Sequence, residues 1–214
     1  MFPRTQRTSH HLKRQKAFWS GLVYRLFQVS LVMIVGSSVV DMKAAEDIDT
    51  QKEYNIKAVS IFSLGLQCDW PSHEDFPDKQ FRIAIVGKDP FMGKLEMVAE
   101  KRKTLHDLPM VIEHPEGADA VGGCRMVFVP GTTDAKLIRE ILRLTRDTPT
   151  MVVGESTEFI SSGGDASLTV EGGRIKLQLN AKSLVRKRIR PNAKLLKLAT
   201  IVQEPEEVTK KLPL

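Results

Sequence analysis

The stretch FRIAIVGKDP, residues 81–90, indicates the fold class of this chain. Its first six residues are mainly apolar and have the length of a buried strand, which Gly87 ends. Asp89 can then cap a helix and Pro90 suits its first position, so a helix is predicted from here to about Lys103. A buried strand that leads through a tight turn into a helix is typical of a parallel sheet covered by helices.

The same alternation continues on both sides of this stretch. Upstream, apolar residues from Tyr54 to Leu66 recur at spacings of three and four, which predicts a helix that ends before Trp70-Pro71. Downstream, the pattern predicts strands at 109–113, 125–129 and 150–153, a helix over 134–146 and a short helical turn at 159–160. Repeated strand–helix units predict one largely parallel sheet with helices packed on it.

The C-terminal part has a different pattern. Residues 166–170 and 174–179 alternate between apolar and polar side chains around a turn with two glycines, which predicts a β-hairpin. Asn180 can cap the helix that follows, and a last helix is predicted over 191–202. We therefore expect a single α/β domain over 54–202, with a largely parallel sheet flanked by helices and a C-terminal β-hairpin that contributes antiparallel edge strands.

The excess of positive charge is confined to the N-terminus. The chain has 214 residues and a net charge of +6, and residues 1–44 alone hold seven Lys or Arg and one acid. The remaining residues are formally neutral, which excludes a general electrostatic attraction to nucleic acid. Aromatic residues make up only 6% of the chain, so stacking platforms for bases are scarce.

The first 44 residues have the pattern of a targeting segment. A basic start is followed by the mostly apolar residues 18–40, which Arg25 interrupts. The uninterrupted apolar stretch, residues 26–40, suits a secretory signal better than the roughly 20 residues of a membrane span. We predict a signal peptide over 1–44, cleaved near Ala44 or Ala45, a polar stalk over 45–53 and a polar tail over 203–214. The alternative is an uncleaved inner-membrane anchor over 18–40, and the domain is exported in both cases.

A set of landmarks in fixed order resembles the YfiR-like family of small exported bacterial proteins. The resemblance covers residues 54–202 and implies a periplasmic regulatory protein that is not an enzyme. The landmarks are KA at 57–58 with WP at 70–71, FRIAIVGKDPF at 81–91, CRMVFV at 124–129, MVVGE at 151–155, Phe159 with GG at 163–164, LN at 179–180 and KLLKLA at 194–199.

The resemblance also implies a partner. The family's namesake binds the periplasmic sensory part of a membrane-bound diguanylate cyclase and so acts on cyclic di-GMP signalling, and relatives are linked to other signalling proteins. A diguanylate cyclase or a sensor kinase is therefore the expected partner. A homodimer is a further hypothesis, because small exported sensors often pair, but no stripe of residues in the sequence indicates one. The alternative function is a periplasmic small-ligand sensor that uses the crevice at the carboxyl ends of the strands, near Gly87, Pro130 and Gly154.

Two cysteines are relevant to the resemblance. In many relatives the first strand carries a cysteine where this chain has Ala84, and that cysteine pairs with one that matches Cys124. Cys68 could replace it, and an oxidising compartment would allow a Cys68–Cys124 disulfide. The alternative is two separate, buried and unpaired thiols.

The sequence offers no pattern that is typical of catalysis or of cofactor binding. The turn after residue 86 lacks the spacing of a phosphate loop, and Ser156 lacks the glycines of a nucleophile elbow. His106, Glu113 and His114 could gather a metal ion, but histidines of surface loops are the more common explanation. We therefore predict no catalytic, cofactor-binding or metal-binding residue.

A basic patch is the main candidate for binding. Seven Lys or Arg fall within residues 182–197, a stretch without an acid, and they are Lys182, Arg186, Lys187, Arg188, Arg190, Lys194 and Lys197. Outside the cytoplasm, an acidic protein surface or anionic lipid is the expected target, and a solvated helix face is the alternative. The predicted partner-binding residues are Arg186, Lys187, Arg188, Arg190 and Lys194.

Overall fold

The structure is a computed structural model that describes residues 49–71, 76 and 78–202. The fold below is that of the unit that begins at Gln51, together with the two helical residues before it. The predicted leader or anchor and the C-terminal tail lie outside the described residues, whereas residues 49–53 of the predicted stalk are helical. Within the part that the structure describes, no helix is long and apolar enough to cross a membrane.

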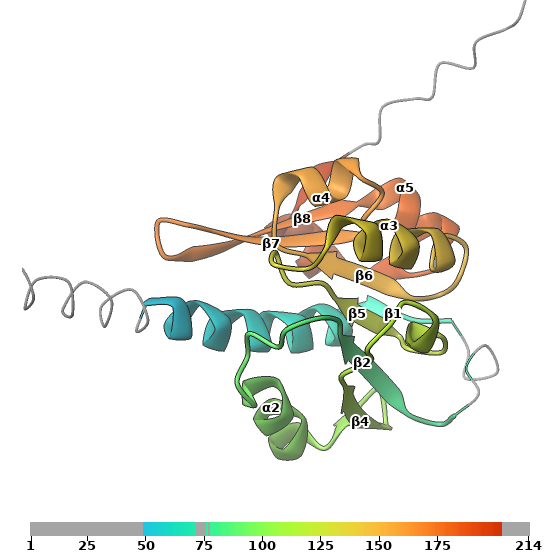
Figure 1. The fold of residues 1–214 in the computed structure, drawn as a ribbon, viewed down its shortest axis with the longest axis horizontal. Coiled ribbons are helices and arrows are strands. Elements are labelled where there is room, and N and C mark those ends of the chain that lie inside the picture. The colour runs from blue at the N-terminus through green and yellow to red at the C-terminus, as the bar shows by residue number, and fades with distance from the viewer. Residues whose placement is uncertain (1–48, 72–75, 77, 203–214) are drawn as a thin grey trace, which may run out of the picture. The chain divides into compact units, whose positions relative to one another are not determined.

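An eight-stranded sheet forms the centre of the domain, in the order β10-β8-β7-β6-β5-β2-β4-β3 (Figure 1). The five strands from β7 to β4 in this order are parallel, as predicted. They are β7 (Ala166–Glu171), β6 (Met151–Gly154), β5 (Met126–Phe128), β2 (Phe81–Ile85) and β4 (Leu108–Glu113).

Antiparallel pairs lie toward both edges of the sheet. β3 (Thr104–Leu105) pairs with β4, and β8 (Arg174–Asn180) forms the predicted hairpin with β7. β10 (Thr200–Val202) adds parallel to β8, so β8 is not itself the edge. The α/β fold with a mostly parallel sheet and antiparallel strands toward its edges is confirmed, although β10 covers the hairpin's outer strand.

Both faces of the sheet are covered by an apolar cluster. Successive side chains of a strand point to opposite faces, so each central strand contributes residues to both clusters. In β2, Ile83 and Ile85 belong to one buried cluster, and Ala84 belongs to the other. β5 divides in the same way, with Phe128 in the first cluster and Val127 in the second. This two-sided burial explains why the central strands read as nearly continuous apolar runs.

Helices cover both faces. The N-terminal helix (residues 49–66), α2 (Lys94–Arg102), α5 (Ala181–Arg186) and α6 (Ala193–Leu198) contribute residues to the first cluster. The short 3-10 helix η2 (Asp119–Val121), α3 (Ala135–Leu144) and α4 (Thr157–Ser161) contribute to the second. Leu66, predicted on the buried side of its helix, is 50% exposed at the point where the helix ends.

The helix after β2 begins later than predicted, at Lys94. Asp89 does not cap it, because its Oδ1 accepts the N–H of Phe91, 2.8 Å away, inside a turn. Met92 and Gly93 then have positive φ values of 52° and 79°, which a right-handed helix does not accept. The predicted helix start was therefore wrong by four residues or more, because a backbone reversal separates the turn from the helix.

The last predicted helix was too long at both ends. α6 covers only Ala193–Leu198, with the Asn192 side chain accepting the N–H of Leu195 at 2.9 Å. Before it, β9 (Arg190–Pro191) pairs with β1 (Cys68–Asp69). After it, the chain becomes β10, in which three β-branched residues join the edge of the sheet.

Two glycines enclose the ring of Phe159 on α4. A Cβ atom built on Gly154 would lie 2.3 Å from this ring, and one built on Gly164 would lie 2.2 Å from it. Real Cβ atoms do not approach other heavy atoms so closely, so the ring occupies space that only glycine leaves open. The last residue of β6 and the glycine shortly before β7 thereby let α4 pack tightly against the sheet.

Candidate functional site

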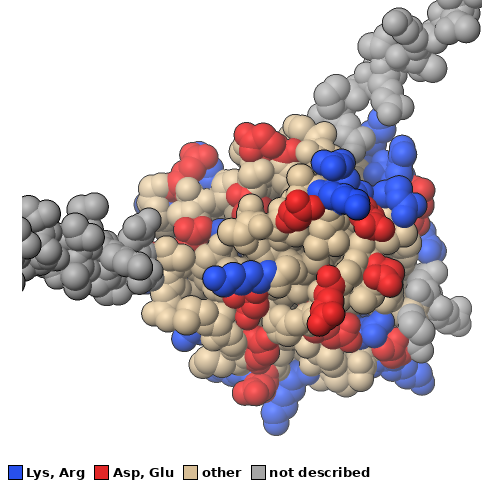
Figure 2. Space-filling view, viewed as in Figure 1, with Lys and Arg blue, Asp and Glu red and all other residues tan. Residues whose placement is uncertain are grey.

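The basic patch lies on α5, β9 and α6, at the β10 side of the sheet. Figure 2 shows basic side chains gathered over the region where Figure 1 places α5. Six of the seven predicted basic residues are exposed, and they are Lys182, Arg186, Arg188, Arg190, Lys194 and Lys197.

Lys187 does not belong to this surface, which corrects the prediction. Its side chain is buried, with Nζ 2.6 Å from Oδ2 of Asp165 and 2.8 Å from the carbonyl oxygen of Thr150. Burial lowers the pKa of Lys187, and the charge of Asp165 opposes that change. Lys187 therefore fastens α5 to the sheet and is not available to a partner.

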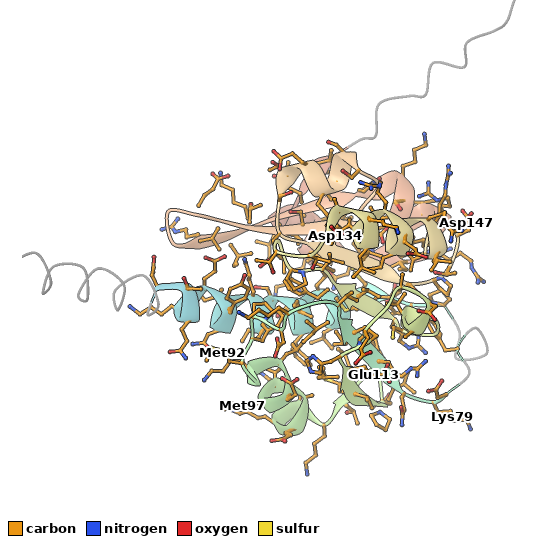
Figure 3. The ribbon with its side chains drawn as sticks, in the orientation of Figure 1. Lys79, Met92, Met97, Glu113, Asp134 and Asp147 are labelled. Atoms are coloured by element: carbon orange, nitrogen blue, oxygen red, sulfur yellow. The ribbon has the colours of Figure 1, made fainter. Side chains whose placement is uncertain are left out.

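Arg186 is partly engaged inside the domain. Its guanidinium donates to the carbonyl oxygen of Arg146 at 3.2 Å and to Oγ of Ser183 at 2.9 Å. Its Nε also lies 3.6 Å from Asp147, which follows α3 and is labelled in Figure 3. Ser183 in turn donates to Oδ1 of Asp165 at 2.5 Å, so Arg186 extends the buried network of Lys187 to the surface.

An apolar pocket of about 230 Å³ lies beside the exposed basic residues, and Arg190 belongs to its lining. Its apolar walls come from β8, α5, the segment around β9, α6 and β10, and include Leu179, Leu184, Ile189, Leu196 and Ile201. This pocket was not predicted from the sequence, because residues 191–202 were assigned to one helix. The β-branched run Thr200-Ile201-Val202 was the signal that could have indicated a strand.

Large apolar side chains are exposed in the lining of this pocket and, at Leu198, elsewhere on α6. Val185 is 74% exposed and Leu198 is 68% exposed, with Leu196 and Ile201 also exposed. Apolar surface that is rimmed by charged residues is typical of a site of protein interaction. We call this surface, formed by the pocket, Val185, Leu198 and the exposed basic residues of 182–197, the C-terminal surface.

A second polar cluster fills the crevice at the carboxyl ends of the central strands. Glu155, directly after β6, accepts the N–H of Gly131 at 2.6 Å and the hydroxyl of Tyr54 at 3.3 Å. Its other oxygen lies 2.5 Å from Nζ of Lys57, which also pairs with Glu53. The carboxylate of Glu155 thus occupies the place where a ligand's anionic group would meet a free backbone N–H.

The N-terminal helix covers this cluster. Lys57 is only 3% exposed, and its ammonium lies 4.7 Å from the ring centroid of Tyr54. Burial, followed by the negative charge of Glu155, raises the pKa of Tyr54, so the hydroxyl remains a hydrogen-bond donor. The geometry does not favour the alternative of a small-ligand sensor that uses this crevice, because a ligand would have to displace Glu155.

The three residues considered for a metal ion are not brought together. Nε2 of His106 lies 3.0 Å from the carbonyl oxygen of Gly65. Glu113 lies 3.4 Å from Arg82, and His114 instead lies 2.7 Å from Glu96.

Both cysteines are free, buried thiols in the structure. Cys68 lies in the first apolar cluster and Cys124 in the second, on the other face of the sheet. A Cys68–Cys124 disulfide is therefore not formed in this structure, and the alternative of two unpaired thiols describes it. Burial raises the pKa of each to about 12, which keeps both protonated and unreactive.

Comparison with known proteins identifies the family. The model of the YfiR/HmsC-like family matches residues 54–200. The match extends over most of the chain, so the protein belongs to this family, as the ordered landmarks predicted. Family membership supports the role of a periplasmic regulator. No curated protein matches the chain.

Two solved structures are similar to parts of the chain. One is a conserved domain protein from Vibrio cholerae O1 biovar El Tor, with 16% identity and a TM-score of 0.45 over 61% of this chain and 57% of that one. The other is 5-formyl-3-hydroxy-2-methylpyridine 4-carboxylic acid 5-dehydrogenase, an NAD+ dependent dismutase, with 9% identity and a TM-score of 0.34 over 59% of each chain.

Proposed function

We propose that this member of the YfiR/HmsC-like family is a non-enzymatic periplasmic regulator that modulates a membrane signalling protein by binding its periplasmic sensory part. A diguanylate cyclase is the first candidate for the partner, and a sensor kinase is the second. The observation that carries the proposal is the C-terminal surface, where a pocket of about 230 Å³ adjoins exposed lysines and arginines.

The C-terminal surface suits an amphipathic segment with acidic residues. Leu198 and Val185 can pack against apolar side chains of the partner, which would remove them from water. Lys194 and Lys197 can then meet acidic residues at the rim, where charge mainly sets the choice of partner and the rate of association. Such binding should weaken as salt is added, because charges at the rim are screened.

Cross-linking in cells tests this proposal on the full chain. A photoreactive amino acid replaces Leu198 on the C-terminal surface, and a matched variant carries it at Met97, which is 58% exposed on α2. We expect the Leu198 variant to form an adduct with a membrane protein that has a periplasmic segment and a cytoplasmic cyclase or kinase domain, identified by mass spectrometry. The Met97 variant should not form it.

Charge reversal gives the second part of the test. The double variant Lys194→Glu and Lys197→Glu should reduce the adduct roughly tenfold, because it places acids against an acidic partner. The control Lys101→Glu and Lys103→Glu changes the net charge equally at exposed positions near the end of α2. An adduct with a second copy of this chain alone, or equal loss in both double variants, would contradict the proposal.

A further inference from the structure

Three side chains with ligand atoms suited to metals converge at the carboxyl ends of β2 and β4. They are Asp89 in the loop after β2, Glu96 in the first turn of α2 and His114, which directly follows β4. One ligand atom from each lies within 4.8 Å of the other two. Figure 3 labels two neighbours of these residues in sequence, Met92 in the loop before α2 and Glu113 at the end of β4.

The topology explains why residues so far apart in sequence meet here. β2 and β4 are adjacent parallel strands, with Ala84 opposite Glu113. The carboxyl ends of both strands therefore lie side by side. α2 connects them and packs against β4. The carboxyl ends of parallel strands are the usual position of ligand sites in α/β folds.

Glu96 shows a second feature that indicates a cation. Its Oε1 lies 2.7 Å from Nε2 of His114. The side chain is 34% exposed, but its Oε2 atom is shielded from solvent and has no hydrogen-bond partner among the described residues. Asp89 is oriented toward the group by the N–H of Phe91, which donates to its Oδ1. A shielded carboxylate oxygen without a hydrogen-bond donor is unfavourable because it has lost its contact with water. A bound cation would compensate for this loss.

We propose that Asp89, Glu96 and His114 bind a divalent transition-metal ion, with Zn²⁺ as the expected occupant. An imidazole with two carboxylates suits Zn²⁺ and its neighbours in the first transition row, whereas Mg²⁺ and Ca²⁺ prefer oxygen ligands alone. Three protein ligands leave a position for water or for a group of a bound partner. His114 is exposed, so the ion can enter from solvent.

Metal titration of the full chain tests the site, with Co²⁺ followed by visible absorption and Zn²⁺ by calorimetry. His10 and His11 near the N-terminus could bind metal adventitiously, so both are first replaced by alanine. We expect this background to bind one equivalent of Zn²⁺. Adding His114→Ala or Glu96→Gln should weaken binding at least tenfold, whereas adding His106→Ala should leave it unchanged.

A thermal unfolding scan separates loss of the site from loss of the fold. Without metal, Glu96→Gln should unfold at the temperature of the background protein within a few degrees. With Zn²⁺, the background and its His106→Ala variant should be stabilised, and the Glu96→Gln and His114→Ala variants should not. Binding that disappears with His10 and His11, or that survives His114→Ala and Glu96→Gln, would overturn the proposal.

Discussion

Two buried lysines hold two helices to the same sheet, yet their surroundings differ. Lys187, next to α5, is paired with Asp165, which is fully buried, and its remaining hydrogen bond goes to a backbone carbonyl. Lys57, on the N-terminal helix, is paired with Glu155 and with Glu53, whose side chain is 33% exposed. The first pair is enclosed by the core, and the second is open to solvent on one side.

The exposure of each ion pair to solvent determines how firmly its helix is attached. An ion pair that is sealed from water is strongly destabilising when one partner is removed, because the other charge cannot be rehydrated. A pair beside solvent can exchange its partner for water at a smaller loss. We therefore expect α5 and the C-terminal surface beside it to be held rigidly, and the N-terminal helix to be the helix that separates more easily from the sheet.

The substitution Asp165→Ala should have the largest effect. It leaves Lys187 charged and buried and also removes the acceptor for Ser183, so the free energy of unfolding should fall by about 3–5 kcal/mol. Urea unfolding measures it, with Asp147→Ala as the control, since exposed Asp147 pairs with Arg186 and should matter by under about 0.5 kcal/mol. Equal effects of the two substitutions would contradict the expectation that the Lys187–Asp165 pair is shielded from water.

The substitution Glu155→Ala should have an intermediate effect, about 1–3 kcal/mol in the free energy of unfolding. It removes the acceptor of Tyr54 and Gly131, but Lys57 keeps Glu53 as a partner. Glu53→Ala is the matched control and should lower the stability by less than about 1 kcal/mol. If Glu155→Ala destabilised the protein as much as Asp165→Ala, the two attachments would be equivalent.

The two thiols provide a smaller, pH-dependent effect. The folded pKa of Cys68 and of Cys124 is about 12, and the unfolded value is about 8.5. Above the unfolded value the unfolded chain loses protons that the folded chain keeps, so stability should fall as pH rises. Between pH 8 and 9.5 we expect the free energy of unfolding, measured with urea, to fall by about 1 kcal/mol per thiol. The substitution Cys68→Ala should remove the part of this pH dependence that Cys68 causes.

Thiol labelling at pH 8 extends this test to the comparison of the helices. Both thiols should react slowly with iodoacetamide in the native protein. In the Glu155→Ala variant, Cys68 lies just beyond the loosened N-terminal helix and should react faster, whereas Cys124 on the other face should not change. Equal acceleration at both cysteines would mean that the whole domain opens and that the helix does not separate alone.

The smallest effect is expected for the exposed residues of the C-terminal surface. Leu198→Ser and Val185→Ser should change the free energy of unfolding by less than about 0.5 kcal/mol, since both side chains are already in water. The buried neighbour Leu195→Ala is the control and should lower it by about 2–5 kcal/mol. A large loss of stability with either serine variant would show that these side chains stabilise the fold and are not available for binding a partner.

The parts of the fold that local sequence determines were predicted well. The central strands were recognised because both of their faces are buried, and the hairpin because its arms alternate around Gly172 and Gly173. Asn180 was correctly expected to cap α5, and its Oδ1 accepts the N–H of Ser183. These features depend on contacts between residues that are close in sequence.

The parts that depend on distant pairing were not predicted. β10 forms because Thr200–Val202 pairs with the outer side of β8. In the sequence, the Leu-rich and Lys-rich stretch before it instead indicates a helix that continues through these residues. Lys187 was predicted as a surface residue because nothing near it in sequence indicates its pairing with Asp165. The approach of Asp89, Glu96 and His114 likewise requires that β2 and β4 be neighbours, which no local pattern specifies.

The enclosure of Phe159 by Gly154 and Gly164 has a consequence for the evolutionary history of the fold. A methyl group on either glycine would collide with the ring, and a smaller residue in place of the ring would leave a void between two glycines that cannot fill it. Phe159 and Gly154 should therefore change together or not at all among homologous chains. Position 164 should remain glycine even where the ring is lost, because a Cβ atom there would also lie 2.8 Å from the backbone oxygen of residue 159.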